Sequence, residues 1–233
     1  MKTEKEGRII AIHQPNYIPW LGYFYKIYQA DIFVFLDDVQ YSNEGMHNYT
    51  YIKTSNGPLR LKYPVQQKFG DKIFDVRSKD ELGWKTKHLN IISSNYRNAD
   101  YFDMVFNDYE KLIMNDYKDV VGLNISLIKF FADKLGFNSK FVKSSDLNIN
   151  LKRTDKIIAI CKKMIGDIYY SGTGARAYQT DEEFRSAGID LRYSVFKPFR
   201  YKQLWTGFQS NVTALDYFMN CGYDWERVLS SQK

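Results

Sequence analysis

The chain has 233 residues, of which 44% are hydrophobic and 26% charged, and this composition excludes disordered, collagenous and disulfide-stapled proteins. Its net charge of +6 favours phosphate-bearing ligands, but no basic stripe predicts nucleic-acid binding. No apolar run reaches the roughly 18 residues that span a bilayer, and the N-terminus has no apolar signal-peptide core, so we expect a cytoplasmic protein with no membrane insertion. Cys161 and Cys221 lie outside any metal-binding spacing, so we expect no metal site.

The N-terminal segment predicts a strand, a helix and a second strand. Residues 8–12 form a β-branched run, which ends before Pro15 and Pro19 because proline cannot donate to a sheet. Apolar residues then recur at helical spacing, and Pro19 suits a first helical turn, which predicts a helix over about 19–29. Residues 32–36 are all apolar, as in a strand buried on both faces. We therefore expect a β-α-β unit.

The rest of the chain alternates between helical and strand patterns. An Asn-Gly pair at 56–57 separates two strand-like runs, 49–54 and 59–63, and predicts a hairpin. Apolar spacing between about 80 and 136 predicts three consecutive helices. The remaining predicted elements are strands near 139–143, 168–170 and 190–195, and helices near 153–165, 179–187 and 211–220.

These elements predict the fold class. Strands that alternate with helices are typical of parallel sheets. We expect an α/β fold with a mostly parallel, Rossmann-like sheet, a β-hairpin and a helical insertion at about 80–136. No repeat or linker marks a boundary, so residues 1–233 are expected to form a single domain that ends in an aromatic-rich segment at about 196–233.

The turn after the first strand is the first candidate site. His13, Gln14, Asn16 and Tyr17 follow the strand between two prolines, and ligands of open α/β sheets bind at the carboxyl ends of strands. Four polar side chains on a stiff turn suit the orientation of a ligand. The alternative is a turn whose polar groups only satisfy the backbone, although His and Gln are poor capping residues.

A pair of acids follows the second strand. Asp37 and Asp38, with Gln40, are expected near His13 because neighbouring parallel strands end at the same edge. Carboxylates there suit a base, a cation ligand or an acceptor for sugar hydroxyls. Adjacent residues of an extended chain point to opposite faces, so only one acid is expected to enter the site. An ordinary Asp-Asp turn is an equal explanation.

Two further segments carry weaker signals. Ser171-Gly172-Thr173-Gly174 follows a predicted strand, and its glycines suit a backbone that approaches phosphate, although a tight connecting turn explains them equally well. His88 lies on a predicted helix beside Lys87, where it is either a general base or, as its apolar spacing favours, a packing residue. Tyr201-Lys202-Gln203 resembles a sugar or base platform, but aromatic tails also simply pack.

Motifs along almost the whole chain share one resemblance. They are 12–24 (IHQPNYIPWLGYF), 30–41, 52–54 with Gly57, 64–65, Trp84 with Lys87 and His88, 95–96, 171–174 with Tyr178, Phe184 with 187–189, and 201–203 with 220–222. Together they strongly resemble the WbqC-like bacterial family. The chain departs from the family at one pair: the family usually has Asn-Arg where this chain has Asn48-Tyr49. If that arginine binds a phosphate or carboxylate, this contact is absent here, which puts the ligand specificity or activity in doubt.

The resemblance implies a function in surface polysaccharide biosynthesis. Members typically lie in gene clusters for O-antigen, part of lipopolysaccharide, and related polymers. The implied reaction is an N-acyltransferase or amide-ligase step, in which a glycyl or related group from a small acyl or amino-acid donor is joined to the amine of a dTDP- or UDP-linked amino sugar.

Under this hypothesis the candidate residues take three roles. The catalytic group is His13, His88 and Asp37, with His88 removing a proton from the attacking amine. The substrate-binding group is Gln14, Asn16, Tyr17, Trp20, Tyr23, Lys26, Asp38, Gln40, Asn48, Lys53, Lys87, Tyr178, Tyr201 and Gln203. The phosphate-binding group is Ser171, Gly172, Thr173 and Gly174, to which Lys53 is a further candidate.

Two alternatives differ in class. A fainter similarity to pantoate–β-alanine ligases predicts a nucleotidyltransferase-like enzyme that uses ATP or a sugar nucleotide, although those enzymes carry a second His where this chain offers Tyr17 and Trp20. ATP and Mg²⁺ are expected as cofactors only if the donor is activated in this way. The other alternative is a non-catalytic subunit that binds a sugar nucleotide.

Overall fold

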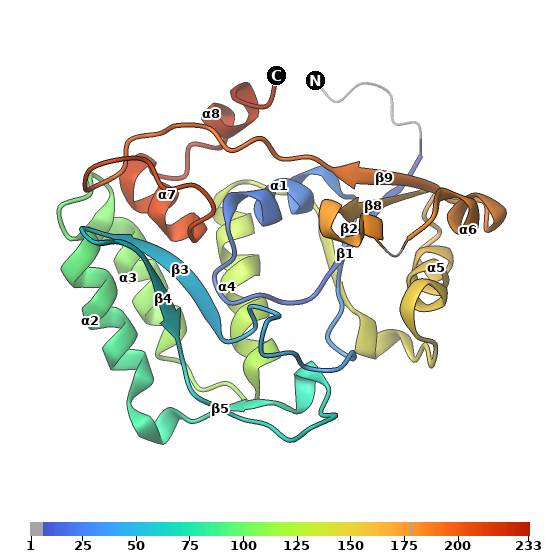
Figure 1. Ribbon diagram of the computed structural model, residues 1–233, viewed down its shortest axis with the longest axis horizontal. Helices are drawn as coiled ribbons and strands as arrows, with labels where there is room; N and C mark the ends of the chain where they lie inside the picture. Colours follow the sequence, from blue (N-terminus) through green and yellow to red (C-terminus); the bar gives the residue numbers. More distant parts are fainter. Residues whose placement is uncertain (1–6, 178) are drawn as a thin grey trace. The chain divides into compact units, whose positions relative to one another are not determined.

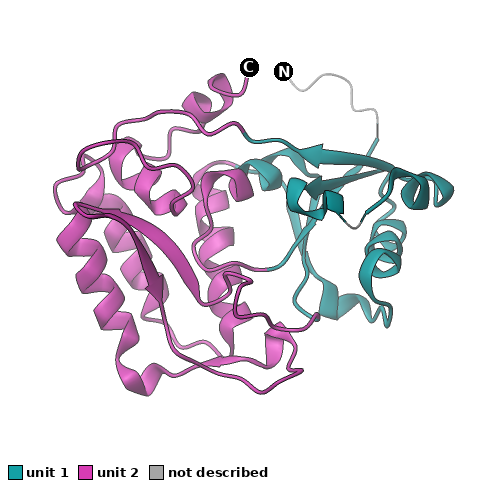
Figure 2. Ribbon diagram, in the orientation of Figure 1, with its two compact units in different colours: residues 1–14, 25–38, 137–196 teal, residues 15–24, 39–136, 197–233 magenta. Residues whose placement is uncertain are grey.

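The computed structural model describes residues 7–177 and 179–233 and divides into two compact units (Figure 2). The sheet unit contains residues up to Gln14, 25–38 and 137–196. The helical unit contains residues 15–24, 39–136 and 197–233. The expected helical insertion at 80–136 is therefore part of a larger unit, which also takes in the aromatic C-terminal segment. No helix among the described residues is long and apolar enough to cross a membrane.

The sheet unit is built on five parallel strands, as the sequence predicted. Its strands are β1 (Ile9–His13), β2 (Ile32–Phe35), β7 (Lys140–Lys143), β8 (Ile168–Gly172) and β9 (Asp190–Ser194). They lie in the order β7-β2-β1-β8-β9 (Figure 1). The chain thus builds outward from β1 through β2 to β7, then returns to the other side of β1 with β8. The order reverses between β1 and β8, which makes their boundary a topological switch point.

The two faces of β1 have different neighbours. Ile10 and Ile12 belong to a hydrophobic cluster with Ile160 of α5 (Arg153–Lys163) and Phe184 of α6 (Asp181–Ser186). Because side chains alternate along a strand, His13 points to the opposite face of the sheet. Helix α1 (Leu21–Gln29) connects β1 to β2 and contributes its residues from 25 onward to this unit.

The helical unit contains the predicted hairpin and three consecutive predicted helices. The hairpin strands β3 (Tyr49–Thr54) and β4 (Gly57–Lys62) pair antiparallel, with a shorter turn than expected because Gly57 already pairs with Thr54. Asp119 caps the helix α4 (Val120–Lys134) by accepting a hydrogen bond from the backbone N–H of Gly122. The other elements are β5 (Val65–Gln66), β6 (Arg77–Ser78), α2 (Trp84–Tyr96), α3 (Phe102–Ile113), α4 (Val120–Lys134), α7 (Ala214–Cys221) and α8 (Trp225–Ser230).

Candidate functional site

The carboxyl ends of β1 and β8 separate at the switch point. The carbonyl oxygens of Ile9 and His13 accept hydrogen bonds from residues of the β2 side, Asp31 N at 2.9 Å and Leu36 N at 2.8 Å. The intervening carbonyl of Ile12 therefore faces β8. Registered pairing between β1 and β8 stops at Ala11 and Tyr170. The next residues of both strands consequently frame the position where open α/β sheets bind ligands.

Several predicted site residues meet at this edge of the sheet unit. His13 ends β1 and is half-buried, and its ring Nδ1 donates to the carbonyl oxygen of Gln14 at 3.0 Å. On β8, the Ser171 hydroxyl is buried and donates to Oε1 of Gln179 at 2.8 Å. Gly172 is half-buried, and Thr173 and Gly174 beyond it are exposed. The structure thus brings the end of the first strand and the glycine-containing turn to one switch point.

Nothing within the sheet unit requires glycine at 172 or 174. Neither residue has a φ in the left-handed region, and a Cβ built on either would meet no atom within 4 Å. At Gly166, by contrast, a Cβ would clash with Cγ1 of Ile10. Neither the backbone conformation nor the packing explains these two glycines. Their missing side chains leave open space beside the backbone, which a ligand needs in order to approach it closely.

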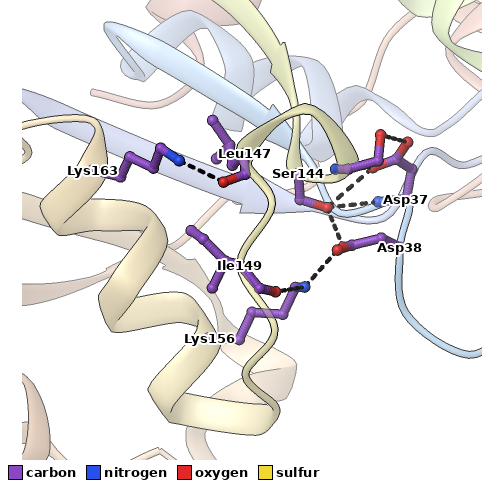
Figure 3. A network of polar contacts seen from close by, with 8 residues as sticks. Asp37, Asp38, Ser144, Leu147, Ile149, Lys156 and Lys163 are labelled. Atoms are coloured by element: carbon purple, nitrogen blue, oxygen red, sulfur yellow. Dashed lines mark hydrogen bonds and ion pairs between the residues drawn. The ribbon is translucent and has the colours of Figure 1, made fainter.

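The two acids after β2 form a buried network (Figure 3). Asp37 is 1% exposed and accepts hydrogen bonds from the hydroxyl of Ser144 at 3.0 Å, the hydroxyl of Ser145 at 2.7 Å and the backbone N–H of Ser145 at 2.9 Å. Asp38 pairs with the Lys156 ammonium at 2.6 Å and also accepts from Ser144. Both acids therefore meet one serine, although adjacent residues of an extended strand would diverge. The chain has already turned here, because Asp37 N donates to Phe35 O at 3.1 Å.

This network fixes the loop that follows β7. Lys156 also donates to the carbonyl oxygen of Ile149 at 3.0 Å, and Lys163 donates to that of Leu147. Asp37 already holds three donors, so it is better placed to support the edge of the sheet than to take a proton. Ser144, Ser145 and Lys156 were not predicted, but Lys156 lies four residues before buried Ile160, and that spacing marks the buried face of a helix.

Lys26 places a buried amine at the switch point. Its side chain is 3% exposed, and its Nζ donates to the carbonyl oxygen of Ile12 at 2.8 Å. Burial lowers the pKa of Lys26 to about 7 because a charge is costly away from water. The amine occupies the side of β1 from which β8 has diverged.

The helical unit buries His88 in an aromatic cluster. His88 is 3% exposed, its Nδ1 lies 2.9 Å from the hydroxyl of Tyr17, and that hydroxyl lies 2.6 Å from the hydroxyl of Tyr109. Tyr63 stacks on Trp84 with ring centroids 4.3 Å apart beside it. Burial lowers the pKa of His88 to about 4, so the ring is neutral at pH 7. This environment supports the packing interpretation of His88.

We expect His88→Ala to lower the free energy of unfolding by about 2 to 3 kcal/mol, because it leaves a cavity and removes one of the two hydrogen-bond partners of the Tyr17 hydroxyl. Denaturant unfolding measures the loss, and exposed Lys87→Ala is the matched control. A variant with unchanged stability and abolished turnover would instead identify His88 as the general base.

Three buried acceptor atoms surround the turn at Pro15 in the helical unit. The Pro15 carbonyl oxygen accepts from Asn124 Nδ2 at 3.0 Å and from His47 Nδ1 at 3.4 Å. Over the ranges 7–177 and 179–233, Asn16 Oδ1, His47 Nε2 and Asn124 Oδ1 have no hydrogen-bond partner. Such acceptors need a donor from outside the protein, and buried water is the usual one.

A second buried carboxylate organises the C-terminal segment of the helical unit. Asp216 is fully buried and accepts from the hydroxyls of Tyr96 at 2.9 Å and Tyr201 at 2.8 Å, and from Nε2 of Gln203 at 2.8 Å. Burial raises the pKa of Asp216, and these three hydrogen bonds oppose the rise. The sequence pattern did not identify Asp216 as a site residue. It lies among apolar residues on a short helix, and nothing in the spacing distinguishes it from them.

Two other predicted binding residues, Asn48 and Lys53, are hydrogen-bonded to groups of the helical unit itself. Asn48 accepts from Tyr41 at 3.1 Å and donates to the Tyr63 carbonyl oxygen at 2.7 Å. Lys53 donates to the carbonyl oxygens of Trp205 and Gly207. The remaining residues are Tyr23, which is buried, Trp20, which is half-buried, Gln40 and Lys87, which are exposed, and Tyr178, which lies outside the described residues.

Comparison with known proteins places the chain in one family. Residues 14–227 match the WbqC-like protein family. A relative from Mycobacterium tuberculosis (strain ATCC 25618 / H37Rv), named uncharacterized protein Rv1507c, is 31% identical over 217 residues, which cover 91% of this chain and 94% of the relative. No solved structure gives a significant match. The chain therefore belongs to the WbqC-like protein family.

Proposed function

We propose that this protein joins a glycyl or related acyl group to the amine of a nucleotide-linked amino sugar in bacterial surface polysaccharide synthesis. The observation that carries the proposal is the switch point of the sheet unit, where His13 and the open glycines 172 and 174 lie at the ends of β1 and β8. The polysaccharide context rests on the resemblance to WbqC-like proteins. The net charge of +6 favours a phosphate-bearing substrate.

The proposed ligand site uses backbone and side chains together. Backbone N–H groups near Gly172 and Gly174 are suited to the diphosphate of a UDP- or dTDP-linked sugar, because the absent side chains let phosphate oxygens approach. Gln14, half-buried beside His13, supplies an amide for sugar hydroxyls.

The proposed chemistry needs one proton acceptor. The sugar amine, in its neutral form, attacks the acyl carbonyl carbon and forms a C–N bond. The bond from that carbon to the donor's leaving group breaks, and the leaving group departs with the electron pair. The amine loses a proton, which His13 accepts through its ring. Asp37 and His88, both buried and hydrogen-bonded, then support the fold around this chemistry.

A nucleotidyl-transfer reaction is the second candidate. It is favoured by a histidine at the end of the first strand of the parallel sheet. ATP with Mg²⁺ would then convert the donor carboxylate to an adenylate, and pyrophosphate would leave. Pyrophosphate release without amide formation would select this reaction over the first.

The direct test is a thermal-shift screen followed by a product assay. The probes are UDP- and dTDP-linked amino sugars, ATP with Mg²⁺, and acyl-CoA donors, since a ligand at 100 times its Kd adds about 2.7 kcal/mol of stability. An amino-sugar nucleotide that shifts the melting temperature is then incubated with glycine and each donor system, and amide formation is read by mass spectrometry. A response to ATP alone favours nucleotidyl transfer, whereas tight sugar-nucleotide binding without any product favours a non-catalytic subunit.

Gly172→Ala tests the open space directly. We expect it to fold with equal or slightly higher stability, by about 0.4 to 1 kcal/mol, because alanine restricts the unfolded chain. We expect nucleotide-sugar binding to weaken by about tenfold or more, because the methyl group takes space reserved for the ligand. Denaturant unfolding measures the stability and calorimetric titration the affinity, each against Gly122→Ala, whose Cβ meets only ordinary contacts. Unchanged affinity would place the ligand elsewhere.

A further inference from the structure

Lys26 is buried at the switch point, and no acid among the described residues forms an ion pair with it. Its Nζ donates to the carbonyl oxygen of Ile12, and burial is the cause of its lowered pKa. The Ile12 carbonyl faces β8, and registered pairing between the strands has ended at Ala11. The amine therefore lies on the β8 side of β1, at the end of the paired segment.

The other titratable groups described at this edge of the sheet unit are not paired with Lys26. His13 ends β1. Tyr170 of β8 and Tyr25 of α1 lie on the face opposite the hydrophobic cluster that contains Ile12. Burial raises the pKa of Tyr170, so its hydroxyl is neutral. Asp37 is held by Ser144 and Ser145, and Asp38 by Lys156. These acids already have donors of their own.

A buried amine without a counter-charge is costly to keep. A neutral side chain would cap the Ile12 carbonyl at less cost, so capping alone does not account for a lysine here. The Ile12 carbonyl faces β8, and on that strand and the turn after it a Cβ at Gly172 or Gly174 would meet no atom within 4 Å. A ligand placed there with negative charge would supply the missing partner.

We infer that Lys26 is the counter-charge for the diphosphate of the nucleotide-linked substrate, and that its amine takes up a proton when the diphosphate binds between β1 and β8. This inference rests on the proposed function for the nature of the ligand. No bond is made or broken in this step: a solvent proton moves to Nζ, and the resulting ammonium pairs with a phosphate oxygen.

The experiment is calorimetric titration at pH 8 in two buffers of different ionisation enthalpy, which counts protons taken up on binding. The probes are UDP-N-acetylglucosamine and dTDP-glucose, whose phosphates are diesters and do not titrate near this pH, and inorganic pyrophosphate. We expect uptake of nearly one proton per site, because burial leaves the free amine mostly neutral at pH 8 with a pKa of about 7. Uptake should vanish at pH 6, where the amine is already charged.

Lys26→Met removes the charge while keeping a long apolar side chain, and Lys162→Met on the exposed side of α5 is the matched control. We expect Lys26→Met to bind nucleotide sugars about tenfold or more weakly and without proton uptake, while Lys162→Met behaves as the wild type. Circular dichroism and thermal melting confirm that Lys26→Met is folded, which separates loss of binding from loss of structure.

The outcomes separate this inference from the proposed function. Nucleotide sugars that bind Lys26→Met as tightly as the wild type, with the same proton count, would overturn the role of Lys26 and leave the proposed function standing. Pyrophosphate that binds with Lys26-dependent proton uptake, while nucleotide sugars do not bind, would support Lys26 and overturn the nucleotide-sugar proposal. Absence of binding by all three probes would overturn both.

Discussion

Lys26→Met is expected to stabilise the protein at neutral and acidic pH. In the folded state burial lowers the pKa of Lys26 to about 7 from the ordinary value of 10.5. The unfolded chain therefore binds more protons between these two values, and stability rises with pH across that window. Below about pH 7 the penalty of the buried ammonium is fully present, and above about pH 10.5 the amine is neutral in both states and the penalty is absent.

The magnitude follows from the width of the window. Each pKa unit corresponds to about 1.4 kcal/mol, so the penalty is on the order of 5 kcal/mol at pH 6. Loss of the hydrogen bond to Ile12 costs Lys26→Met about 1 kcal/mol. We therefore expect a net gain of roughly 4 kcal/mol at pH 6 that falls toward zero or reverses near pH 10.

Denaturant unfolding of the wild type and Lys26→Met at pH 6, 8 and 10 measures this dependence. Lys162→Met should show no comparable gain, because an exposed lysine carries no burial penalty. A Lys26→Met variant that is destabilised at pH 6 would show that the amine has a stabilising partner in the free protein. A lysine that weakens the fold while strengthening ligand binding is typical of a functional site.

The local elements of this protein follow from its sequence pattern. Each strand of the sheet and each of the helices α1 to α7 lies close to where the sequence predicted it, because β-branched runs, apolar runs and helical spacing are local properties. Helix α8 (Trp225–Ser230) was not predicted, since six residues carry too little periodicity. The hairpin turn is also shorter than predicted, because Gly57 is the first residue of β4 and pairs with Thr54 of β3.

The arrangement of these elements did not follow from the pattern. Neither the position of β8 beside β1 nor the assembly of residues 15–24 and 197–233 into the unit of 39–136 is a local property. The switch point is consequently visible only in the structure, although the sequence had predicted a ligand at His13. Strand order decides which chain ends share an edge, and it depends on long-range packing.

Buried polar groups were the hardest part of the site to predict. One of the acids Asp37 and Asp38 was expected to enter the ligand site, and in the structure both accept hydrogen bonds or ion pairs from Ser144, Ser145 and Lys156, over 100 residues away in the sequence. A pair of acids gives no local signal of the donors that will satisfy it. Hydrogen-bond partners distant in sequence therefore decide whether an acid is available for chemistry.

His13→Ala is expected to reduce turnover by about a hundredfold to ten-thousandfold, the range typical of a lost general base. Stability should change little, because His13 is half-buried and stands at the last position of β1. The acyl-transfer assay measures turnover once the screen has identified the substrates, and thermal melting reports on the fold.

The form of the loss distinguishes catalysis from binding. If His13 takes the amine proton, His13→Ala lowers kcat far more than it raises KM, and the lost activity returns in part at higher pH, where more of the amine is already neutral. If His13 only orients the substrate, KM rises while kcat and its pH profile hold. Gln14→Ala is the matched control, because it alters the neighbouring side chain of the same turn and should change KM alone. Full turnover by His13→Ala would remove His13 from the reaction and leave the switch point as a binding site.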